Sequence, residues 1–254
     1  MIDQNLAAQN HAEDLSANLS ASLPANPAGN RARKQAKERP QTEDECQGED
    51  KSDPLREQAE ALRRALRQRM LARREALTPE EVARLSAAVS ARLLATFPVP
   101  PEGPIAFCWP IRNEPDIRAA LLRWQADGIT LALPVAAPGM PLRFRAWRPE
   151  TPLCPDRYGI PAPAKGAYLI PRTLLIPVNA FNRDGFRLGY GGGFFDRTLA
   201  TLIPRPLAIG VGFDLSQTDN LPPQAHDQPL DWIITETRGS RFPLPQEAGI
   251  RNRG

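Results

Sequence analysis

Apolar residues four positions apart mark the start of the patterned part of the chain. Leu62, Leu66 and Met70 form an apolar stripe within LREQAEALRRALRQRMLARREAL, flanked by many arginines. This spacing is typical of one face of an amphipathic helix. We therefore predict a long helix that starts at about Leu55.

A second helix is indicated by the motif TPEE. Thr78 suits the N-cap, Pro79 the first helical position, and Glu81 the position that completes a capping box. The predicted domain thus begins with two helices.

Short apolar runs then alternate with helical stretches up to residue 237. The runs are bounded by Pro, Gly and Asp, and they include PIAFCW, ITLALPVA, LRFRAW, TLLIPVNAF, LAIGVGFD and DWIITET. Two further helices are expected, one in PDIRAALLRWQADG, which Pro115 would open, and one after a run of three glycines. Near-continuous apolar strands that alternate with helices predict an α/β fold with a mostly parallel sheet covered on both faces. Ligands of such sheets bind beyond the carboxyl ends of the strands.

The first 53 residues lack this pattern. They are rich in Ala, Asn, Gln, Ser and acidic residues, and they contain the basic RARKQAKER followed by the acidic TEDECQGED. Such a segment buries too little apolar area to offset its chain entropy, so we predict disorder. The predicted organisation is a disordered extension (1–53), one domain (54–240) and a C-terminal tail (241–254).

Charge and cysteine content narrow the class of protein. The chain carries a net charge of +3, but residues 54–254 hold 26 basic and 19 acidic residues, a balance that suits anionic ligands. Three scattered cysteines without a CxxC pair indicate neither a disulfide framework nor a zinc site. We read no secretory signal and no apolar run of about 18 residues. We expect a cytoplasmic monomer that binds neither membranes nor nucleic acid.

The most distinctive stretch is RLGYGGGFFDR, Arg187 to Arg197. Glycines permit positive φ and let backbone N–H groups point into a concavity, so a glycine run that leads into a helix can bind phosphate. The spacing matches neither GxxxxGK[ST] nor GxGxxG. The run alone fits an anion site and a structural turn equally well. Asp196 could bind Mg²⁺ beside a phosphate, or act as a first-turn acid of the helix.

Three other groups of residues are candidates, each with a simpler interpretation. Glu114 follows a strand in WPIRNEPDI and could accept a hydrogen bond from a ligand or lie in solvent, and Trp109 could line a site or the core. Arg63, Arg67 and Arg74 share a helical stripe that could contact phosphates, although a solvated basic face is the commoner case. His226 and Asp227 could act as an acid–base pair, a metal site or plain loop polarity.

In this order, these segments resemble the 5-formyltetrahydrofolate cyclo-ligase family. The resemblance covers residues 63–236 and rests on RRALRQRMLARREALTPEE, PIRNEPDI, LPV, YGIPAP, RLGYGGGFFDR and IGVGFD…LPPQAHDQPLDWIITE. It implies a three-layer α/β/α sandwich similar to that of sugar-phosphate isomerases and CoA transferases. It also implies an ATP- and Mg²⁺-dependent closure of 5-formyltetrahydrofolate to 5,10-methenyltetrahydrofolate, with release of ADP and phosphate.

The resemblance also implies roles for individual residues. Asp196 and Asp227 would be the metal ligands, and Arg67, Arg187 and Tyr190 would be catalytic. The expected ATP-binding residues are Arg63, Arg64, Ala65, Leu66, Arg67, Arg187, Leu188, Gly189, Tyr190, Gly191, Gly192, Gly193, Phe194 and Phe195. The expected folate-binding residues are Trp109, Glu114, Tyr190, Gly191, Gly192, Gly193 and Phe194.

The sequence departs from the family pattern at three places. Arg63 stands where lysine is usual, Gly192 where some members carry lysine, and Phe194 and Phe195 replace a commoner tyrosine pair. Backbone amides or Arg197 would then have to supply the missing charge at Gly192. These departures leave open a non-catalytic folate or nucleotide binder of the same fold. The basic N-terminal segment and the arginine-rich helix leave open an RNA-associated protein.

Overall fold

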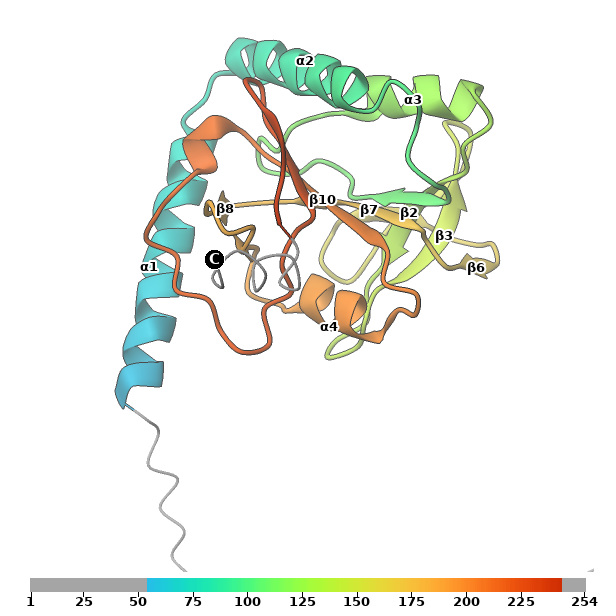
Figure 1. Cartoon of the computed structure of the whole chain (residues 1–254). Helices are drawn as coiled ribbons and strands as arrows, with labels where there is room; N and C mark the ends of the chain where they lie inside the picture. Colours follow the sequence, from blue (N-terminus) through green and yellow to red (C-terminus); the bar gives the residue numbers. More distant parts are fainter. Residues whose placement is uncertain (1–53, 244–254) are drawn as a thin grey trace, which may run out of the picture. The chain divides into compact units, whose positions relative to one another are not determined.

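The computed structural model describes residues 54–243, and the predictions made for 1–53 and 244–254 lie outside the described residues. Five helical segments occur in this part of the chain (Figure 1): α1 (Pro54–Glu75), α2 (Pro79–Thr96), α3 (Arg118–Ala126), α4 (Phe194–Thr201) and the short 3₁₀ helix η1 (Asp214–Ser216). No described helix is both long enough and apolar enough to span a membrane.

The described strands form one large sheet and two small hairpins. The eight-stranded sheet has the order β12-β11-β10-β7-β1-β2-β3-β6, and β11, β10, β7, β1 and β2 run parallel within it. Its strands are β1 (Ile105–Phe107), β2 (Leu131–Val135), β3 (Arg143–Trp147), β6 (Tyr168–Leu169), β7 (Thr173–Pro177), β10 (Leu207–Val211), β11 (Trp232–Ile234) and β12 (Gly239–Arg241). The hairpins pair β4 (Leu153–Pro155) with β5 (Pro161–Pro163) and β8 (Ala180–Phe181) with β9 (Arg187–Leu188).

Both faces of the sheet are buried, as near-continuous apolar strands require. Ile105 and Phe107 of β1 pack with α2 and α3 on one face, whereas Ala106 packs with α4 on the other. This alternation follows from the two-residue period of a strand. In Figure 1, α2 and α3 lie together on one side of the sheet and α4 lies on the other. The predicted α/β class with a mostly parallel sheet is confirmed. The likeness to sugar-phosphate isomerases stays a prediction.

Helix α2 begins as its motif predicts. The Thr78 side chain accepts a hydrogen bond from the Glu81 backbone N–H, and the Glu81 carboxylate accepts one from the Thr78 N–H. The backbone N–H groups of Thr78 and Glu81 therefore both have hydrogen-bond acceptors at the start of the helix.

Helix α3 begins later than predicted. Pro115 was expected to open it, but the helix starts at Arg118 and Pro115 lies in the preceding loop. Asp116 accounts for the difference, because its carboxylate accepts hydrogen bonds from the backbone and the guanidinium of Arg118. Pro115 is left in the segment that carries Glu114 beyond the carboxyl end of β1.

The buried face of α1 matches the predicted stripe at Leu66 and Met70 but not at Leu62. Leu62 is 38% exposed, and the buried residues of this helix are Arg63, Leu66, Met70 and Arg74. Arg63 and Arg74 are 9% and 1% exposed, so the simpler interpretation of a solvated basic face is wrong for these two positions. Buried arginines require partners, and those partners lie in the candidate site.

Candidate functional site

Two clefts share a wall beyond the carboxyl end of β7. The residues that line both are Pro177, Tyr190, Gly192, Phe194 and Phe195, so the glycine loop Gly189–Gly193 and the start of α4 separate them. We call the smaller one, of about 150 Å³, the arginine cleft, and the larger one, of about 560 Å³, the apolar cleft. The sequence placed the glycine loop after a strand and before a helix, and that placement is correct.

The glycine loop needs at least two of its glycines for backbone reasons. Gly191 and Gly193 have φ values of +96° and +62°, which other residues rarely adopt. Gly193 is the N-cap of α4 and has no side chain to bond the first N–H groups of the helix. These N–H groups and the positive end of the helix dipole suit an anion.

Three arginines and two aspartates give the arginine cleft a positive balance. Arg63 and Arg67 reach it from α1, and Arg187 reaches it from β9, opposite Asp196 and Asp227. Burial and the neighbouring Arg63 and Arg64 lower the pKa of Arg67. Burial also lowers the pKa of Arg187, and Asp196 opposes this shift. Asp227 pairs with Arg63 and Asp196 with Arg187, so the three arginines keep one net positive charge over the two aspartates, which an anionic ligand would neutralise.

Not all residues of the predicted ATP-binding set face this cleft. Arg64 and Ala65 are exposed on α1 and are not among the lining residues, and Leu66 packs in a hydrophobic cluster with Met70. The other predicted members, Arg63, Arg67, Arg187, Leu188, Gly189, Tyr190, Gly191, Gly192, Gly193, Phe194 and Phe195, all line it. The helical period separates the two groups, because only one face of α1 meets the loop.

Arg197 lies beside the Gly192 carbonyl, and the Phe194 ring fills the space that a side chain at Gly192 would need. The Arg197 guanidinium donates a 2.7 Å hydrogen bond to the Gly192 carbonyl and lies over the Phe194 ring, 5.3 Å from its centroid. A Cβ at Gly192 would meet the Phe194 ring at 2.9 Å. A cation is thus already present beside Gly192, where the family resemblance raised the question of a missing lysine.

The two predicted metal ligands are both paired with arginine. Asp196 Oδ1 accepts hydrogen bonds from Arg187 and from the Gln228 N–H, each 3.0 Å long. Asp227 binds Arg63 through both carboxylate oxygens, at 2.8 and 3.1 Å. Within residues 54–243, no group of three or more His, Cys, Asp or Glu side chains is close enough to hold a metal ion.

Asp196 and Asp227 differ in how readily each could bind Mg²⁺. Mg²⁺ in nucleotide sites commonly takes one or two protein carboxylates, with phosphate oxygens and water as its other ligands. Both hydrogen bonds of Asp196 use the same oxygen, so its second oxygen could join such a set. Asp227 is less available, because both of its oxygens already accept hydrogen bonds from Arg63. His226 lines the cleft beside them, and its neighbour Asp227 is directed to Arg63.

The apolar cleft has aromatic walls and one buried acid. Trp109, Tyr158, Phe194 and Phe195 contribute ring surfaces, and Glu114 contributes a carboxylate that is 5% exposed. Trp109 packs edge-on against Trp147, and the Arg118 guanidinium lies 4.4 Å from its ring centroid. A flat aromatic ligand with N–H donors fits such a cleft.

Glu114 is held by hydrogen bonds from two segments. Its Oε1 accepts a 2.9 Å bond from the Tyr190 hydroxyl, and its Oε2 accepts a 3.1 Å bond from the Ile111 N–H. Burial raises the pKa of Glu114, and the nearby Arg74 opposes that rise. The interpretation of Glu114 as an exposed loop acid is therefore wrong.

Sequence reasoning did not assign several residues that line these clefts or lie next to them. Arg74 was noted on the arginine stripe but not placed in a site. Its spacing of seven residues, two helical turns, from Arg67 is the signal that could have placed it. Chain pattern gave no signal for the other unassigned lining residues, which include Pro177, Gln224, Cys108, Asp156 and Tyr158.

Comparison with known proteins supports a single family. Residues 59–236 match the model of the 5-formyltetrahydrofolate cyclo-ligase family. The chain is 34% identical to the 5-formyltetrahydrofolate cyclo-ligase of Mycolicibacterium smegmatis over 51% of this chain and 72% of that protein. It is 29% identical to the enzyme of the same name from Escherichia coli K12 over 65% of this chain and 96% of that one. The solved structure of Aquifex aeolicus 5,10-methenyltetrahydrofolate synthetase matches with a TM-score of 0.63 and 28% identity, covering 72% of this chain and 94% of the other.

Proposed function

Because the chain belongs to the 5-formyltetrahydrofolate cyclo-ligase family, we propose that it uses ATP and Mg²⁺ to close 5-formyltetrahydrofolate to 5,10-methenyltetrahydrofolate. ADP and inorganic phosphate are the other products. The observation that carries this proposal is the shared wall between the arginine cleft and the apolar cleft. A phosphoryl group bound at the glycine loop would lie next to a ligand in the apolar cleft, because the two clefts meet at Tyr190 and Phe194.

The two clefts differ in chemistry, as the two substrates do. The arginine cleft offers guanidinium groups and the N–H groups at the start of α4, which suit the phosphates of ATP. The apolar cleft offers ring faces and the Glu114 carboxylate, which suit the flat pterin and its N–H groups. We assign ATP to the arginine cleft and the folate to the apolar cleft.

The proposed reaction has two steps. The formyl oxygen attacks the γ-phosphorus of ATP, the bond to the β–γ bridging oxygen breaks, and ADP leaves. N10 of the folate then attacks the formyl carbon of this iminium phosphate and gives up its proton to solvent, and the carbon–oxygen bond breaks to release inorganic phosphate. Phosphorylation is needed because the unmodified amide oxygen is a poor leaving group.

The chain's own residues would act by position and charge. Arg67, Arg187 and Arg197 would neutralise the charge on the moving phosphoryl group, and the glycine loop would hold it in line with the formyl oxygen. Tyr190 would fix the folate beside that loop through its bond to Glu114. Bound Mg²⁺, held by Asp196 and by Asp227 once it releases Arg63, would supply further charge neutralisation on the phosphates.

The activity can be tested directly with the purified chain. Mixing it with 5-formyltetrahydrofolate, ATP and Mg²⁺ should raise the near-UV absorbance of the methenyl product, with one phosphate released per product formed. Reactions that lack ATP are the control. Phosphate release without the absorbance rise, or no ATP-dependent rise at all, would contradict the proposed function.

A further inference from the structure

Arg74 is a buried cation that lines neither cleft but contacts the segments that do. It lies in the last turn of α1 and is 1% exposed. Its Nε donates a 2.9 Å hydrogen bond to the Arg112 carbonyl, and its Nη1 donates a 2.8 Å bond to Asn179 Oδ1. Its Nη2 donates a 2.7 Å bond to the Tyr190 hydroxyl. One side chain thus joins α1 to the loop after β1, the loop after β7 and the glycine loop.

The Tyr190 hydroxyl continues this chain of hydrogen bonds into the apolar cleft. It accepts from Arg74 and donates to Glu114 Oε1 at 2.9 Å, while Arg74 Nη2 lies 3.9 Å from the same carboxylate oxygen. Each group has one defined role as donor or acceptor, because arginine can only donate and an ionised carboxylate can only accept. The Tyr190 ring lies at the wall of both clefts, so its hydroxyl fixes the wall to Glu114.

The same contacts set the charge of Glu114. Burial raises the pKa of this carboxyl, whereas Arg74, the Ile111 N–H, the Tyr190 hydroxyl and Arg112 all lower it. The other titratable group facing it is the Cys108 thiol, whose pKa is raised by burial and by Glu114. Arg74 is the largest of the influences that favour the ionised carboxylate. Only the ionised form is free to accept hydrogen bonds at both oxygens from ligand N–H groups.

One face of helix α1 holds two residues that line the arginine cleft and, further along, Arg74, which bonds Tyr190 at the wall of both clefts. Arg63 and Arg67 lie in the arginine cleft, and Arg74 lies eleven residues after Arg63, about 16 Å along the helix. The Asn113 side chain ties the end of this helix to the loop that carries Glu114, through bonds to the Arg74 and Leu77 carbonyls. Arg74 is therefore held firmly where it can orient other groups.

We propose that Arg74 is a positioning residue for the folate: it holds the Tyr190 hydroxyl and the Glu114 carboxylate together as one hydrogen-bonding edge of the apolar cleft. The inference rests on the proposed function, since it assigns that cleft to the folate. It goes further by giving a role to a residue that touches neither substrate.

Three variants test this role: Arg74→Met removes the donors and the charge, Arg74→Lys keeps the charge, and Tyr190→Phe removes only the relaying hydroxyl. We expect Arg74→Met to lower kcat/KM for the folate about tenfold or more, the effect of a lost charge-assisted hydrogen bond, and to leave KM for ATP within about twofold. The acidic limb of the pH profile of kcat/KM for the folate should move to higher pH, because Glu114 loses its main cation. Arg74→Lys should recover part of both effects.

Tyr190→Phe keeps the test decisive if Arg74→Met does not fold, because it leaves the Arg112 and Asn179 contacts of Arg74 in place. It should weaken folate binding, measured by calorimetry without ATP, more than it weakens ATP binding. Equal loss for both ligands, or an unshifted pH profile in the Arg74 variants, would overturn the positioning role. Wild-type protein that binds the folate without turnover would contradict the proposed function alone, and the binding measurements would still test Arg74.

Discussion

Arg63 of α1 donates hydrogen bonds to both carboxylate oxygens of Asp227, in the loop before β11, at 2.8 and 3.1 Å. The two side chains are 11% and 3% exposed, and Arg63 also donates to the Pro222 carbonyl at 2.8 Å. The pair therefore lines the arginine cleft and ties this loop to α1. It also occupies a carboxylate that the proposed function assigns to Mg²⁺.

Replacing Arg63 should show how much this pair contributes to stability. Arg63→Met leaves a buried carboxylate without its cation, and we expect the free energy of unfolding to fall by about 3 kcal/mol or more. Arg63→Lys keeps the charge but loses the bidentate geometry, so the expected loss is about 1 kcal/mol. Urea unfolding measures both. Arg69→Met, at an exposed position of the same helix, is the matched control, and equal losses for Lys and Met would contradict the ion-pair interpretation.

Asp196 should be needed for turnover rather than for folding. In Asp196→Asn, the amide oxygen can still accept from Arg187 and from the Gln228 N–H, but the negative charge is lost. We expect kcat to fall about 100-fold or more, as for other groups that stabilise a transition state electrostatically. Circular dichroism should remain like that of the wild type. Asp219→Asn removes an exposed carboxylate outside both clefts and serves as the control; turnover of Asp196→Asn at the control's rate would refute the metal assignment.

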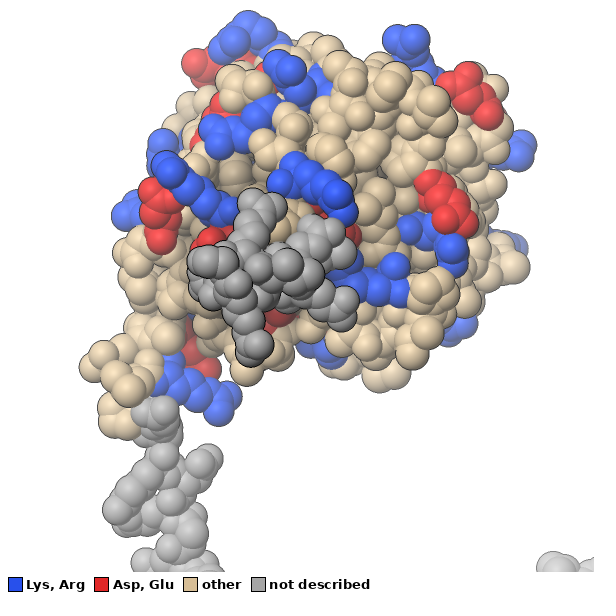
Figure 2. All heavy atoms as spheres, in the orientation of Figure 1, with Lys and Arg blue, Asp and Glu red and all other residues tan. Residues whose placement is uncertain are grey.

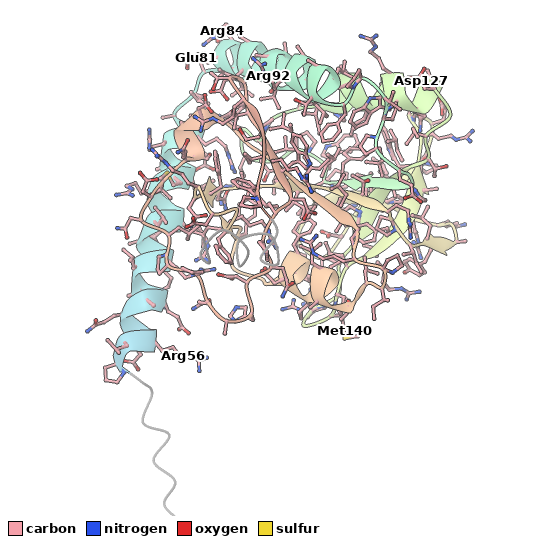
Figure 3. The ribbon with its side chains drawn as sticks, viewed as in Figure 1. Arg56, Glu81, Arg84, Arg92, Asp127 and Met140 are labelled. Carbon is pink, nitrogen blue, oxygen red and sulfur yellow. The ribbon has the colours of Figure 1, made fainter. Side chains whose placement is uncertain are left out.

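Arg197 should supply the positive charge that Gly192 itself cannot. Its guanidinium lies beside the Gly192 carbonyl at the wall between the clefts. We expect Arg197→Met to raise KM for ATP about tenfold, which corresponds to one lost charge-assisted hydrogen bond. KM for the folate should change less. Arg84→Met, on the exposed face of α2 (Figure 3), controls for the loss of one positive charge.

A purely electrostatic attraction of ATP to the protein surface gives a different result. Figure 2 shows Arg and Lys side chains spread over the face in view, with Asp and Glu side chains between them. If this general charge attracted ATP, Arg84→Met and Arg197→Met would raise its KM alike. That outcome would remove the specific role of Arg197.

Local sequence signals predicted the parts of the fold that depend on neighbouring residues. The capping box of Thr78 and Glu81 placed the start of α2, and the apolar runs gave the strands, because both depend on backbone bonding and on a short period. The predicted start of α3 at Pro115 was wrong. The Asp116 carboxylate accepts a hydrogen bond from the Arg118 N–H, and the helix begins at Arg118. The glycine loop was found because its φ values demand glycine at two positions.

Long-range contacts could not be predicted in the same way. The burial of Arg74 depends on Tyr190, 116 positions later, and that of Glu114 depends on the same hydroxyl from 76 positions away. The seven-residue spacing from Arg67 puts Arg74, and not the exposed Arg73, on the buried face of α1, but it does not reveal what Arg74 contacts. The family resemblance assigned Glu114 and Tyr190 to the same ligand, but only the folded structure shows that Arg74 contacts both residues.

Because Glu114 is buried, we expect the free energy of unfolding to depend on pH. Its pKa is raised in the folded chain, mainly by burial, above the value of about 4.3 for an exposed glutamate. The folded state therefore holds this proton more tightly than the unfolded state does. The resulting stabilisation is complete below the unfolded pKa and is lost as the pH rises through the folded pKa.

The variant Glu114→Gln cannot titrate at this position, so comparison with the wild type isolates the effect. As the pH is raised from about 4.3 towards neutrality, the free energy of unfolding of Glu114→Gln should increase relative to that of the wild type. Urea unfolding at several pH values measures this difference, and Glu150→Gln, which removes an exposed acid, is the matched control. A difference that stays constant would show that Arg74 and the Tyr190 hydroxyl balance burial, and a change in the opposite direction would show that they outweigh it. In that case the carboxylate would be ionised at no cost in stability, and the shift of the acidic limb expected for Arg74→Met should be larger still.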